Sequence, residues 1–389
     1  MNSLLELIKY GQSYWLDNLT RAMLKDGTLQ KRVEAQGLRG VTSNPAIFHK
    51  AISGSTDYDA QIAQLVQAQR SLEDIYEQLV VTDVQNACDV LRPVYDAADG
   101  GDGFVSLEVS PYLAHDTEGT RREARHLFQA VNRPNVLIKI PGTPAGVPAI
   151  EQMLYEGINI NITLLFSIQS YEAVAQAYIR ALERRVAEDK PVQNVASVAS
   201  FFLSRIDVLV DQLLGHRIQP GSQGDGPPPE QLVGQVAVAN AKLAYQSFQT
   251  IFCGARWQAL ADQGARVQRP LWASTSTKDP LYSDVCYVEP LIGPHTVNTM
   301  PDETIDAFAE HGAIVENSVE ADVEEARQIL RDLRAVGVDL DFVTQQLQHE
   351  GVQKFIDPLD ALMRMLANKR LTMLGERAGR QAMALGSLK

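Results

Sequence analysis

A lysine interrupts one of the most apolar runs in the sequence. Lys139 lies in "VLIKI", whose other residues are valine, leucine and isoleucine, a composition typical of a strand buried on both faces. Burial disfavours the charged ammonium form, so an amine in this position can act as a neutral nucleophile. Its natural electrophile is a ketone or an aldehyde, with which it forms a carbinolamine and then a Schiff base. The sequence therefore predicts covalent catalysis on a carbonyl substrate at Lys139.

Two carboxylic acids are candidates for the proton transfers that this chemistry needs. Glu108, in "FVSLEV", is expected to shuttle protons while the carbinolamine forms and loses water, either directly or through a water held by Thr163. Asp17, in "SYWLD", is expected to take the proton from the sugar hydroxyl whose oxygen becomes a carbonyl on cleavage. The alternative is a structural ion pair between Lys139 and Glu108, since buried lysine and glutamate are rare unless paired.

Further polar side chains follow the same kind of short apolar run. Asn44, Asn161 and Ser200 suit the hydroxyls of a sugar and the nitrogen of a Schiff base, because amides and hydroxyls both donate and accept hydrogen bonds. Two later segments, "SFFLSRID" and "ASTSTKD", offer a hydroxyl and two cations at a predicted helix start, which suits a phosphate group. The candidate phosphate ligands are Arg205, Ser274 and Lys278. These residues together indicate a phosphorylated sugar as substrate.

Eight short β-rich runs recur along the chain, each followed by a longer helical pattern, as a parallel sheet with crossover helices requires. The runs span 13–17, 38–43, 104–109, 136–140, 160–165, 196–202, 270–274 and 287–292. Eight such units in about 290 residues predict an α/β protein with a closed (β/α)8 TIM barrel. A doubly wound open sheet is the alternative, although no strand runs into the G-x-G-x-x-G turn of dinucleotide-binding sheets.

Alternation within these runs brings the polar residues together. Side chains along a barrel strand point in turn outward to the helices and inward to the axis. In "VLIKI" and "INITLL" the apolar set takes the outward parity, which turns Lys139, Asn161 and Thr163 inward. The same argument turns Glu108 and Asp17 inward. Most of these residues lie near the carboxyl ends of their strands, where barrel enzymes carry their active sites.

We expect residues 1–300 to form the barrel and residues 301–389 to form a C-terminal helical extension packed on it. The final part of the chain keeps a helical pattern up to its end. Between the second and third strands, capping boxes that begin at Ser71 and Thr82 each lead into an apolar-periodic segment. The barrel is therefore expected to carry helical insertions.

Composition narrows the classes of function. Lysine and arginine number 35 against 48 aspartate and glutamate, a net charge of −13 that repels polyanions, so no nucleic-acid partner is expected. No window approaches about 18 uninterrupted apolar residues, and the first residues lack the features of a secretory signal, so no membrane association is expected.

Three scattered cysteines favour a reducing compartment, and we expect a cytoplasmic protein that is a monomer or a homodimer. No His and Cys cluster has metal-ligand spacing, which disfavours a metal-dependent aldolase.

The blocks that carry these residues resemble the transaldolase family over nearly the whole chain. They are, in order, "SYWLDNLTR", "GLRGVTSNPAIF", "VSLEVSP", "VLIKIPGTPAG", "ININITLLFS" and "STSTKDPLYSDVCYVEPLIGPHTVNTMP". The long helical tail resembles that of the larger bacterial subtype. The resemblance implies transfer of a dihydroxyacetone unit from sedoheptulose 7-phosphate or fructose 6-phosphate to an aldose phosphate, in the non-oxidative pentose phosphate pathway, without a cofactor.

By block position, the resemblance also implies a role for each candidate residue. The Schiff-base lysine falls on Lys139, the water-linked acid and base on Glu108, and the aspartate that deprotonates a hydroxyl on Asp17. The residues that fall on the substrate, water and phosphate ligands are Asn44, Asn161, Thr163, Ser200, Arg205 and Ser274. Lys278 stands where many relatives place a second arginine, and a lysine keeps the charge but loses the bidentate fork.

Two alternatives to a transaldolase stay open. A Schiff-base aldolase such as fructose 6-phosphate aldolase would release free dihydroxyacetone, because water rather than an aldehyde would reach the enamine first. A sugar-phosphate-binding protein with an inactive barrel would hold the sugar without modifying Lys139. Sequence spacing does not decide between transfer and release.

Overall fold

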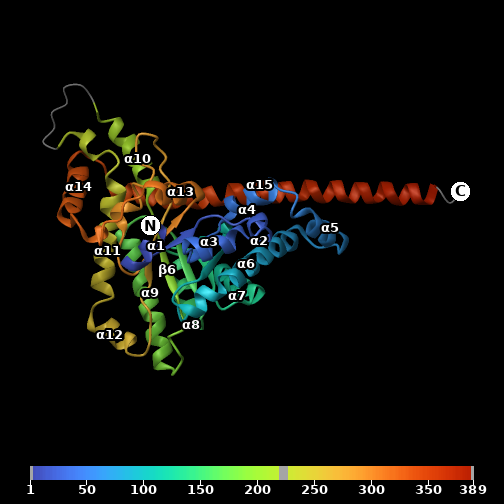
Figure 1. Ribbon diagram of the computed structural model, residues 1–389, viewed down its shortest axis with the longest axis horizontal. Helices are drawn as coiled ribbons and strands as arrows, with labels where there is room; N and C mark the ends of the chain where they lie inside the picture. Colours follow the sequence, from blue (N-terminus) through green and yellow to red (C-terminus); the bar gives the residue numbers. More distant parts are fainter. Residues whose placement is uncertain (1–2, 219–226, 387–389) are drawn as a thin grey trace.

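The structure, a computed structural model, describes residues 3–218 and 227–386. Its centre is a closed barrel of eight parallel strands in chain order, surrounded by helices (Figure 1). The strands are β1 (Gln12–Leu16), β2 (Gly40–Val41), β3 (Phe104–Glu108), β4 (Val136–Pro141), β5 (Ile160–Leu165), β6 (Ser197–Phe202), β7 (Arg269–Ala273) and β8 (Thr296–Met300). Almost every strand residue is buried, as a sheet covered on both faces requires. The predicted (β/α)8 barrel is confirmed.

The eighth strand lies at Thr296–Met300, so the prediction of a strand at 287–292 is wrong. The predicted segment instead contains a short 3-10 helix, η4 (Glu289–Leu291), that packs against a neighbouring helix. Pro290 has no amide hydrogen to donate to a neighbouring strand. The apolar residues around it are buried in the core without forming a strand. The true strand reads "TVNTM", and its three polar residues concealed it from a search for apolar runs.

Fifteen helices lie within the described residues. Those up to the third strand are α1 (Ser3–Leu7), α2 (Arg21–Lys25), α3 (Thr28–Gln36), α4 (Pro45–Ser53), α5 (Asp59–Gln67) and α6 (Leu72–Ala97). Those up to the seventh strand are α7 (Thr117–Val131), α8 (Gly146–Glu156), α9 (Ile168–Ala187), α10 (Ser204–Gly215), α11 (Val236–Ile251) and α12 (Ala255–Ala261). The last are α13 (Asp302–His311), α14 (Val323–Ala335) and α15 (Leu340–Gly386). Four further 3-10 helices are η1 (Ile8–Tyr10), η2 (Pro111–Leu113), η3 (Pro229–Leu232) and η5 (Ser318–Glu320).

The predicted helical insertion between the second and third strands consists of α4, α5 and the 26-residue helix α6. Ser71 caps α6 as expected, because its hydroxyl accepts a hydrogen bond from the Asp74 amide at 3.0 Å. The second helix start, predicted at Thr82, is wrong. Thr82 lies inside α6, and its hydroxyl donates to the Gln78 carbonyl at 2.6 Å, one turn back. Apolar periodicity continues through this point, so one long helix forms.

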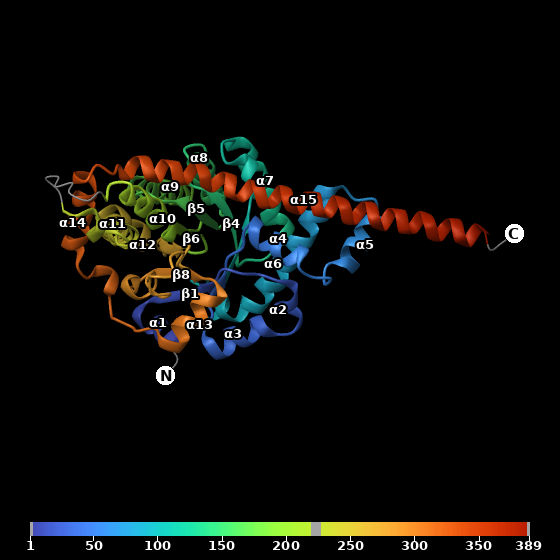
Figure 2. The same cartoon turned by 90° about the horizontal axis from the view of Figure 1, so that it is seen from above.

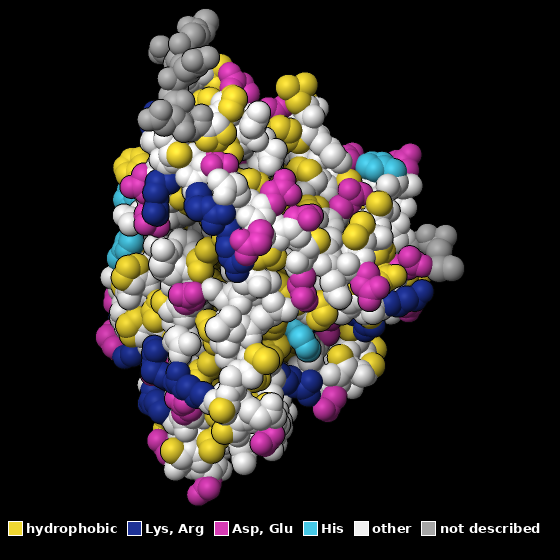
Figure 3. All heavy atoms as spheres, turned by 90° about the vertical axis from the view of Figure 1, so that its left-hand side faces the viewer, with side chains coloured by type: hydrophobic (Ala, Val, Ile, Leu, Met, Phe, Trp, Pro, Cys, Tyr) yellow, Lys and Arg dark blue, Asp and Glu magenta, His cyan; other side chains and the backbone are white. Residues whose placement is uncertain are grey.

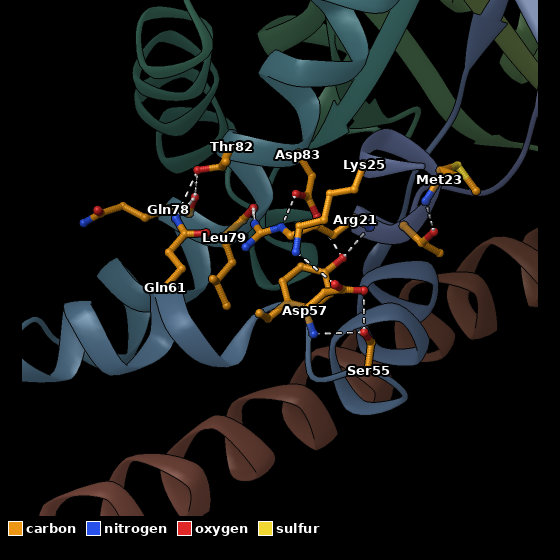
Figure 4. Close-up of polar contacts among 12 residues, drawn as sticks. Arg21, Met23, Lys25, Ser55, Asp57, Gln61, Gln78, Leu79, Thr82 and Asp83 are labelled. Carbon is orange, nitrogen blue, oxygen red and sulfur yellow. Dashed lines mark hydrogen bonds and ion pairs between the residues drawn. The ribbon is translucent and has the colours of Figure 1, made fainter. Parts of the chain in front are cut away.

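A buried ion pair ties α2, which closely follows β1, to α6 (Figure 4). Arg21 Nε donates to Asp83 Oδ1 at 2.8 Å, and Nη2 donates to the Leu79 carbonyl at 3.2 Å. The hydroxyl of Tyr58 donates to the other Asp83 oxygen at 2.8 Å. The Arg21 guanidinium also lies over the Tyr58 ring, 4.2 Å from its centroid. The segment that follows Asp17 is thereby fixed to the insertion.

The C-terminal helix α15 runs across one side of the barrel assembly and continues beyond it (Figures 1 and 2). It contacts α4, α5, α6, α10, η2 and β5. Gln348 on this helix donates to the carbonyls of Gly142 and Leu164, each at 3.2 Å. These two carbonyls lie at the carboxyl ends of β4 and β5, so α15 packs at the end of the barrel where those strands finish.

Surface charge is mixed on the face made by the helices at the left of Figure 1. Figure 3 shows lysine and arginine side chains lying among aspartate and glutamate side chains there, as on an ordinary solvated surface. Among residues 3–218 and 227–386, no helix has both the length and the apolar composition to cross a lipid bilayer.

Candidate active site

A cavity of about 300 Å³ opens at the carboxyl ends of the strands. Its wall contains most of the predicted site residues, namely Asp17, Asn44, Lys139, Ser200, Arg205, Ser274 and Lys278. The other three, Glu108, Asn161 and Thr163, are buried beside this wall on β3 and β5. The strand register places them next to β4, the strand of Lys139. Glu108 on β3 and Asn161 on β5 are the register partners of Lys139 on either side, and Thr163 is the partner of Pro141. The structure therefore brings the predicted residues to one end of the barrel.

Lys139 and Glu108 lie side by side on adjacent strands. Lys139 Nζ is 3.6 Å from Glu108 Oε2, an ion-pair distance that is too long for a good hydrogen bond. The two side chains are only 5% and 3% exposed. Nζ also donates to the carbonyl of Ser43 at 3.3 Å. A buried amine and a buried carboxyl group thus face each other at ion-pair distance, close enough for one water to link them.

Burial raises the pKa of Glu108 to about 7, and the neighbouring Lys139 ammonium opposes part of this rise. Neither Glu108 oxygen has a hydrogen-bond partner among the described residues. A carboxyl group with this pKa is present in both its acid and its base form near neutral pH. That is the property a general acid and base needs.

Asp17, directly after β1, is held by the hydroxyl of Thr42, which directly follows β2. Thr42 Oγ1 donates to Asp17 Oδ1 at 2.6 Å and lies 2.7 Å from Thr299 Oγ1. Burial raises the pKa of Asp17, whereas Lys139 and the Thr42 hydrogen bond lower it. Glu303, whose charge also raises the pKa of Asp17, lines the cavity together with Thr299. The sequence analysis did not identify either residue, because it predicts the eighth strand upstream of its true position.

A chain of hydrogen bonds orients Asn161. Ser200 Oγ donates to Asn161 Oδ1 at 2.7 Å, and Asn161 Nδ2 donates to Ser106 Oγ at 2.9 Å. The amide is therefore fixed beside Lys139 by hydroxyls from β6 and β3. Thr163 Oγ1 is buried and has no hydrogen-bond partner within residues 3–218 and 227–386. An unpaired buried hydroxyl next to the acid and base pair suits an ordered water.

Asn44 has a structural task as well as a place in the cavity wall. It is the N-cap of α4, and its Oδ1 accepts a hydrogen bond from the Ile47 amide at 3.0 Å. Pro45 follows at the first helical position, which favours the same helix start. The cap fixes the Asn44 side chain, and its Nδ2 group takes no part in the cap.

Cationic and hydroxyl groups gather at one part of the cavity. Arg205 lies in the first turn of α10, and its buried Nη1 lacks a partner in the described part of the chain. Ser274 Oγ lies 2.9 Å from Ser204 Oγ, next to the start of the same helix. Lys278 is exposed and donates to Ser276 Oγ at 2.5 Å. Burial lowers the pKa of Arg205, but a guanidinium keeps its charge at neutral pH.

The sequence analysis missed two aromatic residues of the cavity wall, Phe202 on β6 and Phe355. Phe355 lies on α15 and lines the cavity, with its ring centroid 5.7 Å from Lys139 Nζ. The apolar face of a helix predicts burial, but it does not reveal what the helix covers. Only the long-range packing of α15 on the barrel brings this ring to the lysine.

Two other cavities of similar size lie elsewhere. One of about 400 Å³ is at the amino ends of the strands, with Trp15, Arg269 and His295 in its wall and none of the predicted site residues. The other, of about 430 Å³, lies between α6, α7 and α15, and Glu108 contributes to its wall. The cavity at the carboxyl ends of the strands is the one that holds Lys139 together with most of the other predicted site residues.

A family model described as transaldolase/fructose-6-phosphate aldolase matches residues 14–366. The chain belongs to this family. Transaldolase 2 of Nostoc sp. is 52% identical over 373 residues, which cover 95% of this chain and 98% of that protein. The transaldolase of Trichodesmium erythraeum is 47% identical, with 95% of this chain and 97% of the relative covered. The transaldolase of Thiobacillus denitrificans is 46% identical, with 93% and 99% covered.

These similarities confirm the transaldolase resemblance of the sequence blocks. The family description names two activities, transaldolase and fructose-6-phosphate aldolase. The three relatives described above carry the name of the first.

Proposed function

We propose that the protein is a cytoplasmic transaldolase of the non-oxidative pentose phosphate pathway. It moves a dihydroxyacetone unit from sedoheptulose 7-phosphate or fructose 6-phosphate to an aldose phosphate through a Schiff base on Lys139. The observation that carries the proposal is the buried Lys139 amine, 3.6 Å from the Glu108 carboxyl group and in the wall of a cavity that also holds Arg205. The names of the relatives support transfer rather than release.

The first half of the reaction joins the sugar to the enzyme. Glu108, in its base form, takes a proton from the Lys139 ammonium, and the free amine attacks the ketone carbon. Glu108, now an acid, returns a proton to the carbinolamine hydroxyl through a water on Thr163, and water leaves. The product is a protonated Schiff base. A pKa of about 7 allows one carboxyl group to perform both steps at neutral pH.

The second half breaks and remakes a carbon–carbon bond. Asp17 takes the proton of the hydroxyl whose oxygen becomes the aldehyde of the leaving product, and the electrons of the broken bond pass to the Schiff base, which becomes an enamine. The enamine carbon then attacks the acceptor aldehyde, and Asp17 returns its proton to the new hydroxyl. The resulting protonated Schiff base takes up water by the reverse of its formation, which frees the product and restores the Lys139 ammonium and the Glu108 carboxylate. Asn44, Asn161 and Ser200 are the proposed ligands of the sugar hydroxyls, since each offers a donor or an acceptor.

The phosphate group gives the sugar its direction in the cavity. Arg205, Ser274 and Lys278 are its proposed ligands. The unpaired Nη1 of Arg205 and its place in the first turn of α10 support this role, because both favour a bound anion. Lys278 adds charge from an exposed position, so its loss should weaken binding less than the loss of Arg205.

Borohydride reduction in the presence of fructose 6-phosphate tests the Schiff base. Mass spectrometry of the digested protein should find a substrate-derived mass on Lys139 and on no other lysine. Lys139→Arg should fold, remain unlabelled and lose transfer, because a guanidinium stays protonated and cannot form the imine. Bound sugar with an unmodified Lys139 in the wild-type protein would instead identify a sugar-phosphate-binding protein.

Release of free dihydroxyacetone is the second candidate activity, because the family description includes fructose-6-phosphate aldolase. Incubation with fructose 6-phosphate alone, followed by addition of erythrose 4-phosphate, separates the two. A transaldolase should turn over rapidly only after the acceptor is added, with slow release of dihydroxyacetone before that. Steady production of free dihydroxyacetone before that point would favour the aldolase.

A further inference from the structure

The position of α15 on the barrel is fixed by close contacts with the strands that carry the reacting groups. Gln348 donates to the carbonyls of Gly142 and Leu164. Gly142 directly follows β4, the strand of Lys139, and Leu164 lies on β5. One turn later, Gly351 lies so near to Leu164 that a Cβ atom would be 2.8 Å from its Cδ2 atom. The glycine thus permits the helix backbone to approach the end of β5 more closely than another residue would.

The part of β5 beneath α15 is irregular. Leu164 has a φ of +59°, in the left-handed region, and the pairing of β5 with β6 shifts register between Ile162 and Leu165. The Leu164 carbonyl that this irregularity leaves outside the ladder accepts its hydrogen bond from Gln348. The helix is therefore hydrogen-bonded to the end of the strand that carries Asn161 and Thr163.

Phe355 follows Gly351 by four residues and so lies on the same face of α15. Its side chain is buried, with 3% exposure. The ring centroid is 5.7 Å from Lys139 Nζ and 5.9 Å from Arg205 Cζ, and the ring lines the same cavity as both cations. An apolar ring thus faces the amine from an element outside the eight strands. Figure 2 shows this element, α15, running along the barrel.

We propose that Phe355 is a specificity-determining residue that keeps water from the enamine on Lys139, so that the intermediate reacts with an aldehyde. This inference rests on the proposed transaldolase function. In the competing reaction, the enamine carbon takes the proton that Asp17 removed from the sugar hydroxyl, which gives the protonated Schiff base and restores the Asp17 carboxylate. Water then adds to the former carbonyl carbon, the carbon–nitrogen bond breaks, the amine recovers its proton, and dihydroxyacetone leaves. Transfer forms a carbon–carbon bond to the acceptor instead, and neither route changes an oxidation state overall.

The ring suits this task for two physical reasons. A phenyl group offers no hydrogen bond to a water that would otherwise be held beside the reacting carbon. Its electron-rich face also lies toward a nitrogen that carries positive charge in the protonated Schiff base, and a cation at this distance from an aromatic face is attracted to it. A smaller apolar side chain should still exclude water in part, but it has no aromatic face to attract the cation.

The test compares Phe355→Ala, Phe355→Leu and a control, Phe342→Ala. Phe342 lies on the same helix, but 60% of it is exposed, so its loss should not affect the cavity. For each protein two initial rates are measured with fructose 6-phosphate, namely dihydroxyacetone release without an acceptor and transfer to erythrose 4-phosphate. Phe355→Ala should raise the ratio of release to transfer about tenfold, within the range that one apolar contact contributes to discrimination. Phe342→Ala should leave it unchanged.

Borohydride labelling of Lys139 serves as the second readout and should occur in every variant, which shows that the Schiff base still forms. An equal fall of both rates in Phe355→Ala, with an unchanged ratio, would make Phe355 a packing residue only and overturn the inference. If the alanine variant does not fold, Phe355→Leu decides, because it retains most of the buried apolar volume and should raise the ratio about threefold. A wild-type protein that releases dihydroxyacetone but transfers none would contradict the proposed function itself, a result distinct from any change in the variants.

Discussion

At the scale of single residues, the ionisation of Glu108 is set by two opposing neighbours. Removal from water raises the pKa of the carboxyl group, and the ammonium of Lys139 lowers it, with a net value of about 7 against 4.5 for an unperturbed glutamate. Between these two pH values the folded protein keeps a proton that the unfolded chain has lost. The same burial that makes Glu108 useful as an acid and base therefore has a cost in stability.

Glu108→Gln removes this titration and should change the pH dependence of stability. The contribution of Glu108 is fully present below pH 4.5 and is lost as pH rises toward 7, because the unfolded chain ionises first. The free energy of unfolding of the wild-type protein, relative to that of the variant, should fall by about 3 kcal/mol over this interval. Urea denaturation of both proteins across the interval measures the difference. A difference that does not vary with pH would show that Glu108 titrates as a solvated carboxyl group.

At the scale of elements, the short helices after β1 depend on α6 for their position. Arg21 and Asp83 form an ion pair whose side chains are 9% and 0% exposed, and Tyr58 completes the hydrogen bonds of the carboxylate (Figure 4). Burial raises the pKa of Asp83 and the arginine lowers it. Such a pair need not stabilise the fold more than apolar packing would, but the loss of one partner leaves the other buried without its counter-charge.

Asp83→Asn should therefore destabilise the protein by about 3 kcal/mol or more, the usual scale for breaking a buried pair. Asp96→Asn is the matched control, because Asp96 lies on the same helix and pairs with Arg92 at the surface, where the side chains are 57% and 49% exposed. Its loss should change the free energy of unfolding by less than about 0.5 kcal/mol. Denaturation of both variants under one set of conditions gives the comparison. Equal losses would mean that the burial of the first pair has no energetic consequence.

The elements also show what the sequence can and cannot predict. A strand buried on both faces needs a β-rich apolar run, so runs such as "VLIKI" and "INITLL" located β4 and β5, and strand alternation placed Lys139 and Asn161 beside each other. The prediction from apolar runs is wrong at β8, because "TVNTM" has three polar residues, and the hydroxyls of Thr296 and Thr299 are hydrogen-bonded to Gln12 and Thr42. Apolar runs also cannot predict the place of Phe355, because its contact with Lys139 on β4 arises from packing between distant parts of the chain.

At the scale of the whole molecule, the two ends of the barrel hold different kinds of polar network. At the carboxyl end the Glu108 oxygens lack hydrogen-bond partners within residues 3–218 and 227–386, whereas the amino end holds a hydrogen-bonded network around Asp102, although Arg269 Nε has no partner there. There Asp102, 8% exposed, accepts hydrogen bonds from Ser13 and, at 3.0 Å, from Trp15 Nε1. Arg269 lies 3.5 Å from the same carboxylate and donates to the Thr296 carbonyl at 2.6 Å. This network joins the amino ends of β1, β7 and β8 to the start of β3.

Asp102→Asn should separate stability from activity. The variant leaves Arg269 without its counter-charge and weakens the hydrogen bonds of the network, so the free energy of unfolding should fall by about 3 kcal/mol. Because the amino end of a barrel serves stability and the carboxyl end serves chemistry, kcat and KM for transfer should stay at wild-type values while the protein is folded. Lys139→Arg should do the reverse, with transfer abolished in a folded protein. Urea denaturation and steady-state kinetics of the two variants test this division, and a fall of kcat in Asp102→Asn would show that the amino-end network also positions the reacting groups through the strands.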